Sequence, residues 1–127
     1  DDLYNQALFN TLYVLKYRQA FKELVHILAR HFNIAPYQIA EQFKTPVSKE
    51  YVQLYEQVKV HVLDKQNVTR VKELINEGAD VTADPHILLL AIVAEKPTAA
   101  MIQLLLAHGA NPHITGDNNM TPLELLN

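Results

Sequence analysis

The chain has 127 residues, a formal net charge of −3 and no cysteine. A chain of this length forms about one domain and buries roughly 65% of the surface that it exposes when unfolded. The lack of cysteine excludes a disulfide framework, a thiolate metal site and a cysteine nucleophile. The small negative charge argues against a general nucleic-acid binder. No apolar run is long enough to span a membrane, and the first residues do not have the pattern of a secretion signal.

Composition divides the chain into two parts. All six tyrosines and four phenylalanines precede position 56, and all three glycines follow position 77. Residues 1–66 carry eight basic and seven acidic residues, whereas residues 67–127 carry three basic and seven acidic ones. We therefore predict a nearly neutral helical region, 1–66, followed by an acidic region, 67–127, of different architecture.

The first 32 residues have the spacing of one long helix. Apolar side chains recur at steps of three and four, which places them on one stripe of a helix. The stripe consists of Val14, Tyr17, Phe21, Leu24, Val25, Leu28 and Phe32, and Leu8, Leu12 and Leu15 continue an apolar face toward the N-terminus.

Two further helices are predicted before position 66. Pro36 suits the first turn of a short helix through Phe43, because its fixed φ fits that position and its missing N–H would have no helical partner there. Thr45 and Pro46 end that helix. Ser48 is then the predicted N-cap of a third helix. Its buried edge is predicted to contain Tyr51, Leu54, Tyr55, Val58 and Val62.

In the second part, a helix end recurs at a fixed distance. "LINEGADVT" at 74–82 and "LLLAHGANPH" at 104–113 place Gly78 and Gly109 31 positions apart. The apolar residues before each glycine keep the same offset: Val71, Leu74 and Ile75 before the first, and Ile102, Leu105 and Leu106 before the second. A left-handed residue at a helix end costs a side chain with Cβ about 1 to 2 kcal/mol but costs glycine little. The recurrence therefore predicts two helices that each end at a left-handed glycine.

The segments "VTRVKELINEGADVT", "MIQLLLAHGANPH" and "GDNNMTPLELL" resemble the ankyrin repeat, and the resemblance covers residues 56–127. Thr121, Pro122 and Leu123 match the start of a repeat, in which Thr caps the first helix and Pro occupies its first turn. The resemblance implies an all-α fold, an ankyrin-repeat solenoid of two to three units with a truncated last unit. Residues 1–66 would be an N-terminal helical cap or adaptor, whose last helix could belong to the first repeat.

The match has departures. The interval from Gly109 to Thr121 leaves room for a full β-turn finger, but the interval from Gly78 to Asp84 is half as long. We expect a short first finger, with Asp84 and Pro85 replacing Thr-Pro as the helix start.

The resemblance extends less clearly to the first part. Residues 23–34 can be aligned with residues 101–112, but His31 and Phe32 then replace Gly and Ala. Without glycine the cap argument does not apply at that register. The first part is therefore either a decayed repeat or an unrelated helical cap.

Residues that could carry catalysis or bind metal do not form a recognisable pattern. His26 and His31, like His108 and His113, are five positions apart, whereas two helical ligands on one face need four. Ser48 has no neighbouring base and is explained as a cap. We predict no enzyme activity, no metal site and no cofactor.

The resemblance implies a protein–protein interaction module, because repeat stacks leave fingers and inner helices free to form a concave binding surface. The candidate partner-binding residues are Asp84, His86, His113, Thr115, Asp117, Asn118, Asn119 and Glu124. Ordinary turn chemistry also explains these residue types. The acidic balance predicts a protein partner with a basic patch and an association rate that falls with salt, and predicts no nucleic-acid partner.

Two functions remain open. In the first, the chain is an ankyrin-repeat scaffold that recruits a partner protein, as part of a larger protein. Ankyrin proteins act in the eukaryotic cytosol or nucleus, and intracellular bacteria make them as effectors that engage host proteins, so a cytoplasmic location is expected. In the second, it is a non-catalytic structural domain that packs against a catalytic domain absent from this sequence. In both, Leu123, Leu125 and Leu126 begin an apolar helix that a continuation of the chain or a partner should cover.

Overall fold

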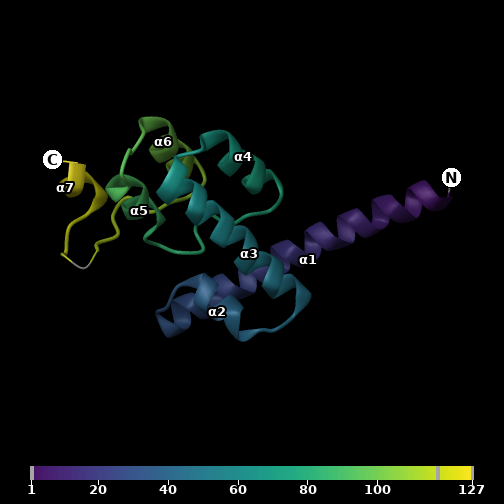
Figure 1. Cartoon of the computed structure of the whole chain (residues 1–127). Coiled ribbons are helices and arrows are strands. Elements are labelled where there is room, and N and C mark those ends of the chain that lie inside the picture. The colour runs from purple at the N-terminus through teal and green to yellow at the C-terminus, as the bar shows by residue number, and fades with distance from the viewer. Residues whose placement is uncertain (1, 117, 127) are drawn as a thin grey trace.

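The computed structural model describes the backbone of residues 2–116 and 118–126, and the side chains of residues 16–64, 66–116 and 118–125. The described part is all-helical, as predicted, with seven α-helices and one π-helical turn. In chain order these are α1 (Asp2–Phe32), α2 (Pro36–Gln42), α3 (Pro46–Val60), η1 (His61–Lys65), α4 (Val68–Asn76), α5 (Ile87–Val93), α6 (Ala99–Ala107) and α7 (Pro122–Leu126). Figure 1 shows a helical body from which the N-terminal half of α1 projects. Within this part of the chain, no helix is both long and apolar enough to cross a membrane.

The C-terminal half of α1 packs on α2 and α3, but not through the whole predicted stripe. Val25 and Ala29 are buried, whereas Tyr17, Leu24 and Phe32 are exposed. The prediction was therefore wrong for these three residues. The neighbours of α1 lie on the Val25 side of the helix, and periodicity alone does not identify which of two adjacent apolar faces will be covered.

The left-handed residue after α1 is Asn33, with φ of 56°, and Ile34 N donates to Ala29 O at 3.1 Å. The helix thus ends two residues beyond the register at which His31 was aligned with a glycine. Asparagine tolerates the left-handed region, because its short side chain bonds locally, so this cap needs no glycine.

The helix α3 begins at Pro46, and its N-cap is Thr45 rather than the predicted Ser48. Ser48 N donates to Thr45 Oγ1 at 3.1 Å, and Thr45 N donates to Ser48 Oγ at 2.9 Å. Pro46 has its φ already set for the first helical position, so the helix starts there and Ser48 becomes the third residue of a reciprocal cap. The predicted buried edge of α3 is confirmed, because all five of its residues are buried.

The predicted boundary between the two parts lies at a sharp change of direction. The turn η1 continues α3 directly, and Gln66 after it is left-handed, with φ of 47°. Gln66 Oε1 accepts from Thr98 N at 3.2 Å and from Thr98 Oγ1 at 3.1 Å. The boundary residue thereby connects the end of η1 to the start of α6.

The helices α4 and α6 begin alike, 31 residues apart. Asn67 Oδ1 accepts from Arg70 N at 3.0 Å, and Thr98 Oγ1 accepts from Met101 N at 3.2 Å. Each cap satisfies a backbone N–H that has no partner within the first helical turn.

They also end alike. Gly78 and Gly109 have φ of 107° and 98°, so both predicted left-handed caps are confirmed. Ala79 N donates to Leu74 O at 2.9 Å, and at the same offset Ala110 N donates to Leu105 O at 3.0 Å.

The turn after each glycine is built in the same way. Thr82 N donates to Asp80 Oδ1 at 2.9 Å, and His113 N donates to Asn111 Oδ1 at 2.9 Å. Because Asp and Asn both accept from the backbone two residues onward, either residue closes the turn.

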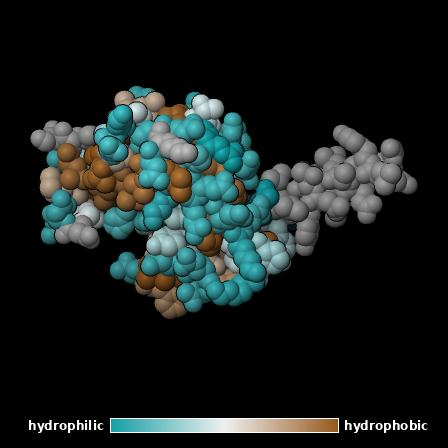
Figure 2. Space-filling model, in the orientation of Figure 1, coloured by the Kyte–Doolittle hydropathy of each residue, from teal (hydrophilic) through white to brown (hydrophobic). Residues whose placement is uncertain are grey.

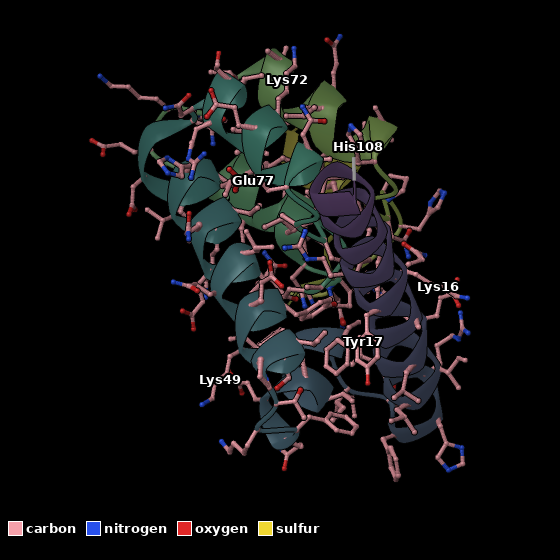
Figure 3. The ribbon with its side chains drawn as sticks, turned by 90° about the vertical axis from the view of Figure 1, so that its right-hand side faces the viewer. Lys16, Tyr17, Lys49, Lys72, Glu77 and His108 are labelled. Carbon is pink, nitrogen blue, oxygen red and sulfur yellow. The ribbon has the colours of Figure 1, made fainter. Side chains whose placement is uncertain are left out.

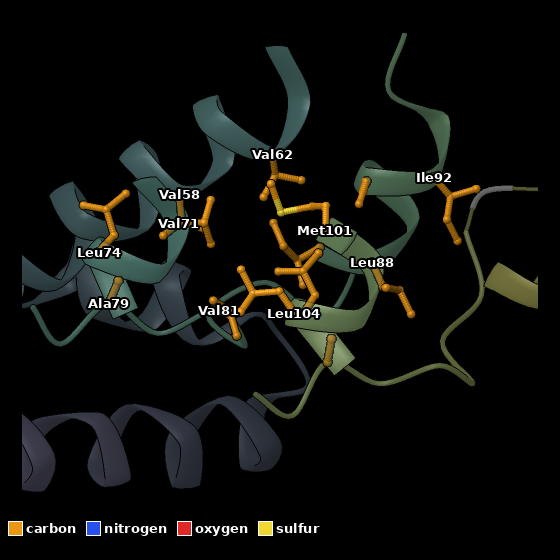
Figure 4. Packing of buried hydrophobic residues seen from close by; sticks show 14 of the residues in the cluster. Val58, Val62, Val71, Leu74, Ala79, Val81, Leu88, Ile92, Met101 and Leu104 are labelled. Atoms are coloured by element: carbon orange, nitrogen blue, oxygen red, sulfur yellow. The ribbon is translucent and has the colours of Figure 1, made fainter. Parts of the chain in front are cut away.

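The last six elements contact one another as two rows. The helix α5 contacts η1 before it and α7 after it, while α4 contacts α6. Across the rows, α3 contacts α4 and α5 contacts α6. The main core fills the space between the rows (Figure 4). Its buried residues are Leu54, Val58, Val62, Val71, Leu74, Ala79, Val81, Ile87, Leu88, Ala91, Ile92, Met101, Leu104, Leu105 and Ala110.

A second, aromatic-rich cluster joins α1 and α2 to α3. Phe21 packs edge-on against Phe43 and Tyr51, with both pairs of ring centroids 5.7 Å apart. Tyr37 N donates to Ala83 O at 3.1 Å, which fixes α2 to the connection between α4 and α5. The first 44 residues therefore cover one side of α3 and the turn that follows α4.

Candidate functional site

Most of the predicted partner-binding residues are exposed, but they differ in what else their side chains do. His86 precedes α5, and five others lie along the connection from α6 into α7. The exposed candidates are His86, His113, Thr115, Asn118, Asn119 and Glu124. Asp84 is half-buried, and Asp117 lies outside the described residues.

Asp84 is held by structural contacts. Its side chain is only 16% exposed, and its carboxylate accepts from Tyr55 Oη at 3.1 Å and from His86 N at 3.0 Å. Burial raises the pKa of Tyr55 well above 10, and the charge of Asp84 and this hydrogen bond raise that pKa further. Asp84 therefore closes the turn into α5 and connects it to α3.

Glu124 is also part of a cap. Glu124 N donates to Thr121 Oγ1 at 3.3 Å, and Thr121 Oγ1 donates to Glu124 Oε1 at 3.0 Å. The predicted capping role of Thr121 is confirmed, and the Glu124 carboxylate is directed to the start of its own helix.

The connection between α6 and α7 closes on itself near its tip. Gly116 N donates to Met120 O at 3.2 Å, and Asn119 N donates to Gly116 O at 3.0 Å. Asn118 Oδ1 accepts from Met120 N at 3.2 Å, so this side chain supports the turn. His113 and Thr115 precede the tip and are exposed. Among the candidates, these two are the best placed to contact a partner.

Sequence reasoning did not identify the largest polar cluster, which surrounds Asp80. This side chain is buried at the turn after α4, and α1 and α3 both reach it. The Asp80 carboxylate accepts from Tyr51 Oη at 2.7 Å and from Thr82 Oγ1 at 2.6 Å, and lies 2.6 Å from His26 Nε2. Lys22 Nζ lies 3.7 Å away. The only signal in the sequence was an acidic residue at the position where the second turn has the neutral Asn111.

These contacts determine the charge of Asp80. Burial by itself raises the pKa of the carboxyl group, but the hydrogen bonds from His26 and Thr82, the charge of Lys22 and the hydrogen bond from Tyr51 outweigh it. The pKa of Asp80 is held well below its ordinary value, so the buried group is a carboxylate. The cluster thus joins α1 to the body through a buried charge.

Two surface hollows flank α1. A trough of about 420 Å³ lies between its last turns and the turn after α6, with Arg30, Ile34 and Asn111 among its lining residues. A more apolar groove of about 670 Å³ lies between α1 and the connection from α2 to α3. The groove is lined by Tyr17, Arg18, Ala20, Phe21, Leu24, Phe43, Thr45, Pro46, Val47 and Glu50. Figure 3 shows Tyr17 on the side of α1 toward α3.

Among the described residues, no group of three or more histidine, aspartate or glutamate side chains is arranged to hold a metal ion. Comparison with known proteins identifies no matching family model, no matching curated protein and no matching solved structure.

Proposed function

We propose that this chain is a protein–protein interaction module built as a short ankyrin-type stack. The observation that carries the proposal is the two-row arrangement, in which α5 contacts both η1 and α7 while α4 contacts α6. The recurrence of the same caps and turns at an offset of 31 residues supports it. In such a stack, neighbouring units stabilise one another and leave the turns between them free to vary.

The first 44 residues act in this proposal as a cap. A terminal repeat exposes an apolar face that must be covered. The aromatic cluster between α1, α2 and α3 provides this cover on the N-terminal side. The chain then presents its second turn, between α6 and α7, as the surface available to a partner.

The proposed partner is a protein with a basic patch. The region from 67 onward carries an excess of acidic residues, and complementary charge steers association. His113 and Thr115 are the proposed contacts, because their replacement leaves the caps and turns intact. A cytoplasmic location, including that of an effector acting on host proteins, is part of the same proposal.

The experiment compares His113→Ala/Thr115→Ala with the parent chain as bait for proteins from a cell extract, quantified by mass spectrometry. Specific partners should be depleted about tenfold or more for the variant, a loss of about 1.4 kcal/mol, with no change in melting temperature. The matched control is His108→Ala, another exposed histidine near the end of α6. Equal capture by the double variant and the parent would contradict the proposed surface.

A second candidate function is favoured by the opposite end of the body. Figure 2 shows hydrophobic residues gathered over α5 and α7, and Leu123 is 68% exposed. An apolar end of this kind suits a structural domain that packs against a further domain of the same chain, or against a partner that covers the last unit. Salt distinguishes the two functions. Association with a basic partner through the acidic turns slows as salt rises, whereas apolar packing does not.

A further inference from the structure

Half of α1 makes no contribution to the body of the molecule. The printed contacts of α1 with other elements begin at Arg18, which pairs with Glu50 of α3 and donates to Glu77 O at 3.1 Å. Residues 2–15 continue the same helix away from the body, and no other described element lies beside them (Figure 1). The structure thus contains a bare helical arm of about 21 Å, at about 1.5 Å per residue.

The sequence of this arm is not that of a solvated helix. It reads "DLYNQALFNTLYVL", in which leucine, tyrosine, phenylalanine, valine and alanine predominate and no basic residue occurs. A helix that is apolar on most sides is stable when something covers it. A single helix of this length is marginal in water without packing. The arm therefore requires a partner surface.

The apolar groove begins where the arm ends. Tyr17, Phe21 and Leu24 provide its α1 side, and Phe43, Pro46 and Val47 provide the opposite side. Leu24 is 43% exposed there, although it is a large apolar side chain. The groove has two apolar walls, so it can cover more than one side of an inserted helix.

We propose that two copies of this chain pair through antiparallel α1 helices, with residues 2–15 of each copy seated in the apolar groove of the other. A twofold axis near the middle of α1 fills both grooves at once and leaves no free site, as in a closed dimer. The two halves of α1, 2–15 and 16–32, are nearly equal in length, so neither arm extends past the partner's helix.

Charge favours this pairing over the parallel one. Residues 1–15 contain two aspartates and no basic residue, whereas residues 16–32 contain Lys16, Arg18, Lys22 and Arg30 against the single acidic Glu23. Antiparallel pairing places the acidic end of one α1 beside the basic half of the other. It also brings the positive N-terminal end of one helix dipole near the negative C-terminal end of the other. Parallel pairing would place like charges and like dipole ends together.

The proposal is tested by sedimentation equilibrium of the 127-residue chain over a wide range of concentrations, with helicity checked by circular dichroism. The parent chain should reach a dimer mass and no higher. Leu24→Glu should weaken dimerisation about tenfold or more, because a charge then enters the apolar groove. The matched control is Leu106→Glu, since Leu106 on α6 is 42% exposed and lies outside the groove, and this variant should dimerise like the parent chain.

The orientation is tested by disulfide cross-linking, since the chain has no cysteine of its own. Oxidising a mixture of Leu8→Cys and Leu24→Cys chains should give mainly the mixed dimer. A predominance of Leu8→Cys homodimer would overturn the antiparallel arrangement. A parent chain that stays monomeric, or whose dimer is unaffected by Leu24→Glu, would overturn the proposal and assign the arm to another protein or a lipid surface. Neither test involves partner capture, so the proposed interaction function stands or fails separately.

Discussion

Asp80 carries the largest electrostatic commitment of any single described residue. Its side chain is 3% exposed, and a carboxylate this deep is tolerated only when donors surround it. The donors come from α1, α3 and its own turn, so one charge connects three segments. The matching position of the second turn, Asn111, has no such enclosure and carries no charge. Asp80 thus marks the turn that α1 covers.

We expect Asp80→Asn to lower the free energy of unfolding by about 3 kcal/mol at neutral pH, because it leaves buried donors without their charged partner. The pKa of Asp80 is depressed in the folded state, so its stabilisation is fully present above the ordinary pKa of about 3.9 and is lost as the pH falls below it. Urea unfolding at a series of pH values should therefore show an acid-induced loss in the parent chain that is smaller in the variant.

The control for this measurement is Asp64→Asn at an exposed site, which should leave both the stability and its acid limb nearly unchanged. An Asp80→Asn chain with the parent's acid limb would mean that the contacts of Asp80 do not depress its pKa.

At the scale of the element, each helix of the second part is bounded by local chemistry. Side-chain caps begin α4 and α6, and left-handed glycines end them. These features depend on residues within a few positions of one another, which is why spacing alone located them. The same local chemistry placed the cap of α3 at Thr45, because Thr-Pro outranks a serine two positions into the helix.

We predict that Gly78→Ala and Gly109→Ala each lower the free energy of unfolding by about 1 to 2 kcal/mol, because alanine is strained at their positive φ. Gly109→Ala should cost at least as much as Gly78→Ala. A Cβ there would lie 3.4 Å from Thr82 Cγ2, whereas one at Gly78 would lie 3.7 Å from the flexible Arg18 side chain. Thermal and urea denaturation measure both changes.

Gly116→Ala provides the matched control, because this glycine has no positive φ and its added Cβ would meet Leu89 Cδ1 at an ordinary 3.5 Å. We expect a change within about 0.5 kcal/mol. Equal costs at all three glycines would remove the conformational explanation.

At the scale of the whole molecule, the two parts defined by composition share one core. Leu54, Val58 and Val62 come from the aromatic-rich part, yet they pack in the main cluster with residues of the glycine-containing part. Asp80 adds a polar connection across the same boundary. The proposed stack and its cap are therefore coupled rather than merely adjacent.

We accordingly expect one cooperative unfolding transition. Tyrosine fluorescence reports only on residues before position 56, whereas far-ultraviolet circular dichroism reports on all helices. The two signals should give the same urea midpoint, because neither part keeps its core when the other unfolds. Separate midpoints would instead indicate two independent domains that meet near Gln66.

The sequence by itself determined the helical class, the ends of α4 and α6 and the buried edge of α3, because periodicity, caps and glycine conformations act over a few residues. Only the tertiary structure decided which face of α1 is covered, that Asp80 is a buried junction, and where the apolar groove lies. These depend on contacts such as the one from His26 to Asp80, which joins residues 54 positions apart. Such contacts are set by how helices pack in space, and no local pattern along the chain encodes them.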